Sequence, residues 1–240
     1  MDVKMILDVL IGFLYLQLHF AVLAGTTVFL SKKVKLPGEL YRKMLHMVSV
    51  FSIMPIVIPT KHWISAVLIC ALFITEAYLG TKLTNIEKGV GMKQRSAGEQ
   101  QRSMMLLYGT YMLLILIGWG LFNQKWIVVL SVLAWGVGDA AAALVGKKFG
   151  KHKLSGKYIE GTKSVEGTVA MFAVSFVSVF ALYLRHSSMS TSWFVVLVCF
   201  WIAVLSALVE LFSKHGLDTI ACPTIALFGF SIVTMVAGKI

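Results

Sequence analysis

The chain has 240 residues, of which 58% are hydrophobic and only 14% charged, and its mean hydropathy is +0.83. These values exclude a soluble domain, because a polar surface requires a larger share of charged residues. The net charge of +11 does not indicate nucleic-acid binding, since the basic residues occupy short connections between apolar runs.

Eight apolar runs are long enough, or nearly long enough, to cross a membrane. None shows the alternation of a barrel strand, and a chain in hydrocarbon must satisfy its backbone hydrogen bonds within each span. We therefore expect an all-α, polytopic membrane helix bundle that forms one integral membrane domain over residues 1–240. The expected spans are 5–30, 44–59, 62–80, 103–121, 126–146, 165–184, 192–212 and 220–238.

The second run is short and contains Pro55 and Pro59, so it could instead be re-entrant, which would reverse every later orientation. The distribution of basic residues favours eight full spans. The odd-numbered connections hold seventeen Lys and Arg residues, whereas the even-numbered ones hold only Lys61, Lys125 and Arg185. By the positive-inside rule, the odd connections are expected in the cytosol and both termini on the opposite side.

Five acidic residues lie within the expected spans or near their ends, where a charge is costly and therefore indicates a functional site. Under this topology they share the cytosolic face. They are Glu76, Asp139, Glu166, Glu210 and Asp218. Glu76 could instead be a structural ion-pair partner. The catalytic face is expected to be formed by the connections 31–46, 81–102, 139–167 and 210–223.

Asp139 lies in a run where Gly138, Ala142 and Gly146 recur at intervals of four. Such a run could be a helix-packing motif, but packing leaves the carboxylate unexplained. A carboxylate that could hold Mg²⁺ is followed here by residues suited to phosphate oxygens at a helix start. These residues are Lys147, Lys148, Lys163, Ser164 and Gly167. The lysines could also be a solvated loop that obeys the topology rule.

Two further groups of charged residues lie near the expected cytosolic face. Arg42 and His46 share one helix face with Lys43 between them, and could be either phosphate ligands or a membrane anchor with an incidental histidine. Arg95 and Glu99 in the third connection could equally belong to a solvated loop.

The ordered set of motifs resembles the phytol, farnesol and dolichol kinase family of CTP-dependent polyprenol kinases. The similar motifs run across every expected cytosolic connection, between about residue 39 and residue 223. They are Arg42-Lys43-x-x-His46, Arg95-x-x-Gly98-Glu99 leading to Tyr108, Gly138-Asp139-Ala140, Lys163-Ser164-x-Glu166-Gly167 and Gly216-Leu217-Asp218.

This resemblance implies transfer of the γ-phosphoryl group of CTP, with Mg²⁺ as cofactor, to the hydroxyl of an isoprenoid alcohol in the membrane. It assigns Asp139 and Asp218 to Mg²⁺, and Glu166 or Glu210 to metal binding or proton acceptance, with His46 as a further candidate base. The phosphate ligands are expected among Arg42, Lys43, Lys147, Lys148, Lys163, Ser164, Gly138 and Gly167. No nucleic-acid partner is expected, and the sequence does not indicate the oligomeric state.

Other functions stay open at this point. The stretch from Gly138 to Gly167 is also similar to the phosphatidate cytidylyltransferases, whose closing motif is richer in glycine and has a second aspartate. A CTP-dependent diacylglycerol kinase is a further relative with the same motifs. Outside the enzymes, intramembrane acids also occur in ion-coupled transporters, although those acids should lie near the midplane, often between repeated halves.

Overall fold

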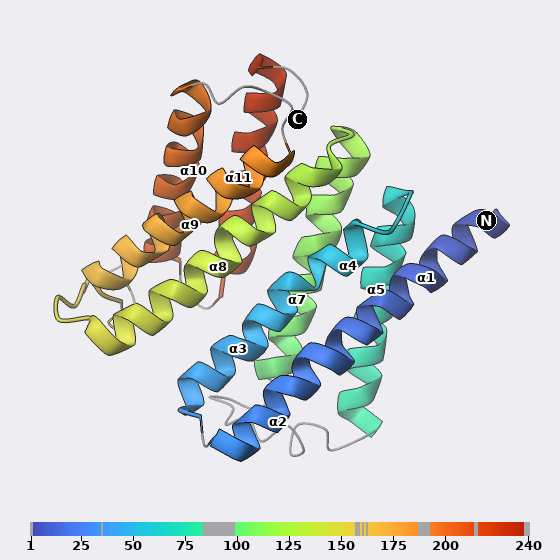
Figure 1. Ribbon diagram of the computed structural model, residues 1–240, viewed down its shortest axis with the longest axis horizontal. Coiled ribbons are helices and arrows are strands. Elements are labelled where there is room, and N and C mark those ends of the chain that lie inside the picture. Colours follow the sequence, from blue (N-terminus) through green and yellow to red (C-terminus); the bar gives the residue numbers. More distant parts are fainter. Residues whose placement is uncertain are drawn as a thin grey trace. The chain divides into compact units, whose positions relative to one another are not determined.

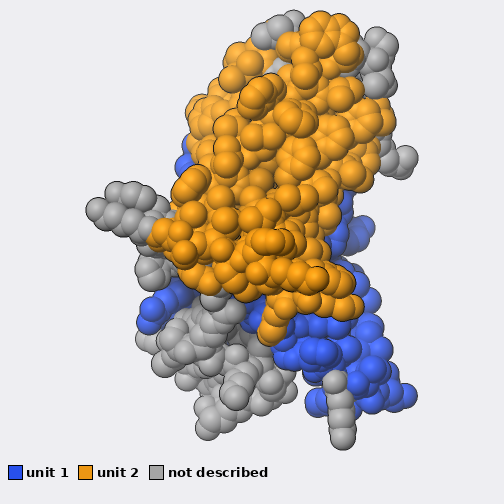
Figure 2. Space-filling view, turned by 90° about the vertical axis from the view of Figure 1, so that its left-hand side faces the viewer, with its two compact units in different colours: residues 1–116 blue, residues 117–240 orange. Residues whose placement is uncertain are grey.

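The computed structural model describes residues 2–34, 36–83, 99–156, 159, 161, 163–186, 193–213 and 216–237. Within these residues the regular secondary structure is helical, with two isolated β-bridges in the connection before residue 165. The chain divides into two compact units, unit 1 with residues 1–116 and unit 2 with residues 117–240 (Figure 2). The expectation of a single membrane domain stays a prediction.

Figure 1 labels the helices along the chain. Those of unit 1 are α1 (Val3–His19), α2 (Gly25–Val34), α3 (Gly38–Phe51), α4 (Ile53–Val57), α5 (Trp63–Leu83) and α7 (Glu99–Leu114). A π-helical segment, η1 (Phe20–Ala24), joins α1 to α2, and a second, η2 (Ile115–Leu121), follows α7. Unit 2 contains α8 (Lys125–Phe149), α9 (Val165–His186), α10 (Trp193–Phe212) and α11 (Asp218–Ala237).

Each of the eight predicted runs contains helix in the part that the structure describes, which confirms an all-α polytopic membrane bundle. Among the described residues, six segments are long and apolar enough to cross a membrane: Val3–Val34, Gly38–Val57, Trp63–Gly80, Gln101–Leu121, Lys125–Phe149 and Trp193–Phe212. The apolar stretches of the other two helices, Val165–Ala181 and Asp218–Ile232, are shorter. Their orientation, and that of the termini, stays a prediction.

The run that contains Pro55 is bent rather than shortened. Its helix breaks at Ser52 between α3 and α4, because Pro55 lacks the N–H that would bond to the carbonyl of Phe51. Side chains satisfy carbonyls at the break: Ser52 Oγ donates to the Ser49 oxygen at 2.6 Å, and Tyr111 donates to the same oxygen at 3.0 Å. With this bend the segment still has 20 residues from Gly38 to Val57, enough to cross a membrane.

Several helices extend further into the charged connections than the apolar runs indicate. Most of the predicted connection 31–46 is helical, since α2 ends at Val34 and α3 begins at Gly38. Likewise α8 continues to Phe149, past the predicted end at residue 146. Long basic side chains can keep their charge in water while their backbone stays helical. A helix can therefore continue past the end of its apolar run.

Unit 2 is built around α8. Every residue of α8 from Ile127 to Gly136 is buried, and α8 packs against α9, α10 and α11. A helix that is apolar on all sides is expected at the centre of its bundle. In Figure 1, α9 runs beside α8 along most of its length. The central position of α8 places Asp139 where three other helices can contribute side chains to its surroundings.

Candidate functional site in unit 2

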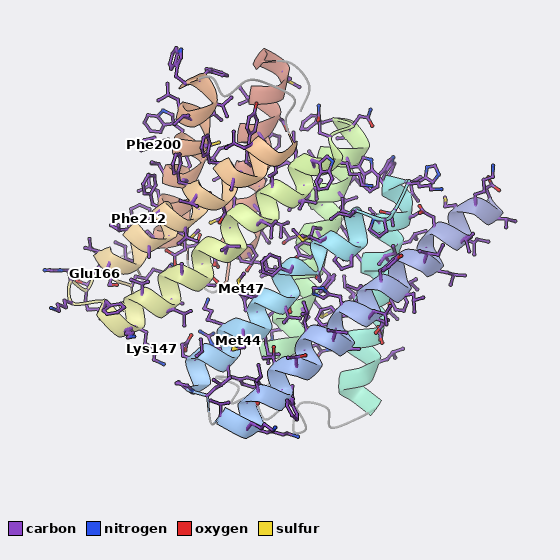
Figure 3. All side chains as sticks on the ribbon, in the orientation of Figure 1. Met44, Met47, Lys147, Glu166, Phe200 and Phe212 are labelled. Carbon is purple, nitrogen blue, oxygen red and sulfur yellow. The ribbon has the colours of Figure 1, made fainter. Side chains whose placement is uncertain are left out.

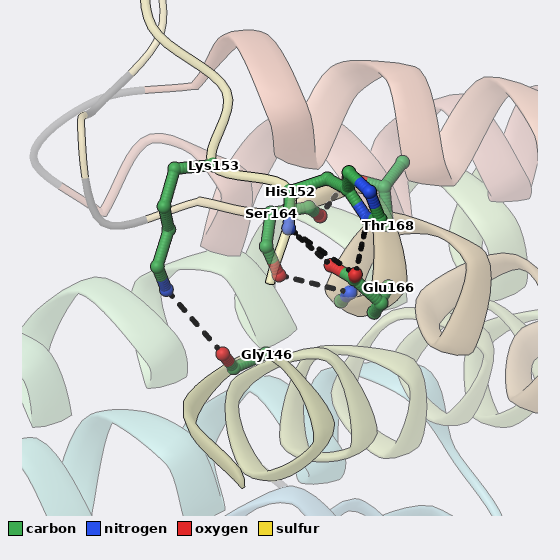
Figure 4. Close-up of polar contacts among 7 residues, drawn as sticks. Gly146, His152, Lys153, Ser164, Glu166 and Thr168 are labelled. Carbon is green, nitrogen blue, oxygen red and sulfur yellow. Dashed lines mark hydrogen bonds and ion pairs between the residues drawn. The ribbon is translucent and has the colours of Figure 1, made fainter. Parts of the chain in front are cut away.

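The connection between α8 and α9 forms a short hairpin that positions Lys163. Its two sides are held together by hydrogen bonds from the Leu154 N–H to the Lys163 oxygen and from the Val165 N–H to the His152 oxygen, both 3.0 Å long. Lys153 also reaches across to the carbonyl of Gly146, at 3.5 Å, near the end of α8 (Figure 4). The hairpin therefore fixes the backbone on which Lys163 and Ser164 stand.

Ser164 is the N-cap of α9. Its buried hydroxyl accepts a hydrogen bond from the Gly167 N–H at 3.2 Å, which satisfies one of the free donors at the helix start. Glu166, in the first turn, accepts hydrogen bonds from the ring of His152 at 2.7 Å and from its backbone N–H at 3.2 Å (Figure 4). The structure thus places Glu166 against the hairpin, and the roles predicted for Ser164, Glu166 and Gly167 stay predictions.

Lys163 forms an ion pair with Glu210, near the end of α10. The Nζ–Oε1 distance is 2.7 Å, and the side chains are only 14% and 11% exposed. Nζ also donates to the backbone carbonyl of Glu210, where a cation is favoured because the negative end of the helix dipole lies there. Two residues that the sequence separates by 47 positions therefore form one partly buried ion pair.

Asp139 and Asp218 lie within electrostatic range of Glu210. Cys222, one helical turn after Asp218, lies within electrostatic range of both carboxylates and of the Lys163–Glu210 pair. Asp218 begins α11, and its carboxylate accepts a hydrogen bond from the indole N–H of Trp135 on α8 at 3.4 Å. The structure therefore gathers Asp139, Lys163, Glu210 and Asp218, which we call the carboxylate–lysine cluster, from α8, the hairpin, α10 and α11.

The carboxylate oxygens of this cluster are donor atoms of the kind that divalent cations such as Mg²⁺ prefer. The three acidic side chains of the cluster outnumber its one lysine, so the cluster favours additional positive charge. Among the described residues, no group of three His, Cys, Asp or Glu side chains is arranged as a complete metal site. Mg²⁺ normally takes one or two carboxylates and completes its octahedron with water and phosphate oxygens, so Asp139 and Asp218 are a suitable protein contribution.

Two lysines near the end of α8 have exposed side chains. Lys147 and Lys148 are exposed, and Lys148 Nζ lies 5.2 Å from the centroid of the Phe149 ring. Lys147 at the end of α8 and Glu166 at the start of α9 lie at the same end of this helix pair (Figure 3). Their exposure leaves both lysines accessible to an anion at this end of unit 2.

Small residues allow α8 and α9 to approach closely. A Cβ on Gly167 would lie 2.9 Å from the Ala142 carbonyl oxygen and 3.3 Å from Gly146 Cα, and one on Gly138 would meet Met171 and Ser175 of α9. The packing interpretation of the four-residue repeat is therefore correct, and its partner is α9. Gly138 and Gly167 are both buried in this contact, and their predicted phosphate contacts stay predictions.

The basic motif of unit 1 lies on α3. Arg42 forms an ion pair with Glu39, one turn earlier, and Lys43 is only 7% exposed although it carries a charge. His46 lies one turn after Arg42 on the same helix. These three residues are described within unit 1, and their predicted roles toward phosphate stay predictions.

The remaining candidates also belong to unit 1. Glu76 on α5 accepts a hydrogen bond from Gln17 of α1 at 2.5 Å, so it has a polar partner on another helix, and its predicted role stays a prediction. Arg95 lies outside the described residues, and so does the side chain of Glu99, whose backbone begins α7. Tyr108 bonds to the hydroxyl of Ser52 at 2.7 Å, beside the bend in α3 and α4.

Sequence reasoning missed two contacts of the site. One is the hydrogen bond from Trp135 to Asp218. Its only signal in the sequence is the tryptophan one turn before Asp139, since a buried indole N–H needs an acceptor. The His152–Glu166 pair has no local signal, since its members are 14 residues apart.

Comparison with known proteins gives one partial match. Over 92 residues the chain is 37% identical to the phytol kinase of Synechocystis sp., and the aligned stretch covers 38% of this chain. The chain thus spans about 37% of the length of that relative. No protein-family model matches the chain, and no solved structure matches it. This similarity supports, over part of the chain, a relation to the polyprenol kinases.

Proposed function

We propose that the protein is a membrane kinase that transfers the γ-phosphoryl group of CTP to the hydroxyl of an isoprenoid alcohol. The observation that carries this proposal is the carboxylate–lysine cluster, in which Lys163 pairs with Glu210 and two further acids from other helices lie within electrostatic range of Glu210. The partial similarity to a phytol kinase supports a kinase with an isoprenoid alcohol as acceptor. The choice of CTP and Mg²⁺ is inherited from the family that the motifs resemble.

In this proposal Asp139 and Asp218 hold Mg²⁺. When bound, the ion would neutralise charge on the phosphate oxygens of the nucleotide. Lys163 contributes a second positive charge from the start of α9, and the exposed Lys147 and Lys148 attract the nucleotide to this end of unit 2.

The reaction forms a bond between the alcohol oxygen and the γ-phosphorus and breaks the bond from that phosphorus to the oxygen bridging to the β-phosphate, so CDP leaves. The hydroxyl proton passes to a carboxylate. Of the two candidate acceptors, we favour Glu210, because it lies in the cluster with the proposed cation ligands, whereas Glu166 lies against the hairpin. Phosphoryl transfer depends mainly on alignment and charge neutralisation, which a cluster of charged side chains can provide.

The acceptor would enter sideways from the membrane, with its isoprenoid tail between helices and its hydroxyl at the lysine-rich end of unit 2. We place this end on the cytosolic side, where the nucleotide is available. A polar site at the end of a helix bundle serves a reaction between a water-soluble donor and a lipid better than a site at the midplane.

The first experiment follows γ-labelled CTP into lipid. Membranes that contain the protein are incubated with Mg²⁺ and, separately, phytol, farnesol, geranylgeraniol, dolichol or diacylglycerol. We expect label in one isoprenoid phosphate, and a loss of at least about 100-fold on Asp139→Asn because the proposed cation ligand is lost. The matched control is Asp2→Asn, since Asp2 is an exposed aspartate before α1 whose side chain forms no capping bond.

Other results of this experiment would indicate other functions. Label in phosphatidate alone would indicate a diacylglycerol kinase. Transfer of CMP to phosphatidate without transfer of γ-label would indicate a cytidylyltransferase. Failure of all lipids to take up label from any nucleoside triphosphate would refute the kinase and favour an ion-coupled transporter.

A further inference from the structure

Trp135 makes a polar contact from α8 to the first residue of α11. Its side chain is only 1% exposed, in the most buried part of the helix. The indole N–H can only donate, and a buried donor without an acceptor is costly. The structure supplies the acceptor from another helix, since the indole N–H donates to Oδ2 of Asp218, the first residue of α11.

Trp135 also stands next to Asp139. The two residues are four positions apart on α8 and therefore share one face of the helix, one turn apart. Trp135, which bonds to Asp218, thus lies on the same face of α8 as Asp139. One helix both carries Asp139 and holds Asp218.

Asp218 needs such a restraint. It follows a turn in which Gly216 has a φ of 81°, and its side chain is only partly buried. Glu210 carries the same charge and lies within electrostatic range of it, so repulsion favours rotamers that turn Asp218 away. A hydrogen bond from a rigid, buried indole opposes that rotation.

We propose that Trp135 is a positioning residue for the cation site: its N–H holds one oxygen of Asp218 so that this carboxylate and Asp139 bind one divalent cation together. The inference rests on the proposed function for the identity of the cation site. Trp135 itself touches neither the cation nor the substrates. Residues that orient metal ligands in this way commonly change metal affinity by about 10–100-fold when they are replaced.

The test is direct binding of Mn²⁺, the spectroscopic substitute for Mg²⁺, to the purified full chain in nanodiscs with CTP present. Trp135→Phe keeps an aromatic ring but removes the N–H together with the five-membered part of the indole, so a double-mutant cycle is needed to separate the lost hydrogen bond from lost packing. We expect its Mn²⁺ dissociation constant to rise by about tenfold in electron paramagnetic resonance titrations. The control is Trp201→Phe, because Trp201 is 58% exposed on α10 of the same unit, and its dissociation constant should not change.

A double-mutant cycle separates positioning from general packing. If Trp135 acts through Asp218, then Trp135→Phe should weaken Mn²⁺ binding no further in an Asp218→Asn background. Thermal unfolding of each variant in nanodiscs checks that the fold is kept. Equal Mn²⁺ affinity in the wild type and Trp135→Phe, or equal losses in both backgrounds, would overturn the inference.

Mn²⁺ binding tests the positioning role of Trp135, whereas phosphoryl transfer tests the proposed function. Weaker Mn²⁺ binding in Trp135→Phe, together with no phosphoryl transfer to any alcohol, would support the positioning role and refute the kinase. Phosphoryl transfer by a wild type that binds no Mn²⁺ would overturn the positioning role and leave the kinase standing.

Discussion

Lys163 is the positive charge of the cluster in unit 2 and is only 14% exposed. Replacing it by methionine would leave Glu210 without its ion-pair partner, near two other carboxylates. We expect Lys163→Met to lower the free energy of unfolding by about 2–4 kcal/mol, because an unpaired, partly buried charge is costly. Unfolding in increasing mole fractions of dodecyl sulfate measures this change.

The second partner provides the control for that prediction. Adding Glu210→Gln to Lys163→Met removes the unpaired charge and should recover about half of the lost stability. A double variant that is less stable than Lys163→Met would show that the ion pair does not account for the effect. This result concerns folding alone and is independent of catalysis.

At the scale of the elements, the contact between α8 and α9 depends on glycine. Gly167→Ala would bring a Cβ to 2.9 Å from the carbonyl oxygen of Ala142, and backbone atoms cannot move away cheaply. We expect this variant to be destabilised by about 1–3 kcal/mol, since the crowding outweighs the gain in helix propensity. Thermal unfolding in detergent is the measurement.

Gly109 offers a matched comparison for Gly167. It also lies within a helix, α7, but a Cβ there would meet nothing within 4 Å. Gly109→Ala should therefore be neutral or stabilise the protein by up to about 1 kcal/mol through helix propensity alone. If both alanine variants melted alike, close approach of α8 and α9 would not be what requires glycine at position 167.

At the scale of the whole molecule, the asymmetry of basic residues predicts which connections face the cytosol. We expect His62→Cys to react with a membrane-impermeant maleimide in intact cells, and Ser155→Cys to react only after permeabilisation. Both positions are exposed, whereas the native Cys70, Cys199 and Cys222 are buried and should give little background. The reverse pattern would contradict the predicted orientation of both connections.

Much of the architecture follows from the sequence alone. Apolar runs of membrane length determine the helices, because in hydrocarbon each backbone polar group must find its partner within the same segment. This local rule placed α10 and α11 within two residues of their observed ends. It also marked Asp139, Glu210 and Asp218 as candidates, since a charge near hydrocarbon needs a reason.

Only the tertiary structure decided which of these residues meet. Three contacts of the site join residues that are distant in sequence. They are the ion pair of Lys163 with Glu210 and the hydrogen bonds from Trp135 to Asp218 and from His152 to Glu166. The helical period states which residues share a face of one helix, but not which faces pack together. That choice depends on side-chain shape across the contact, such as the glycines that bring α9 onto α8, and it determines the composition of the cluster.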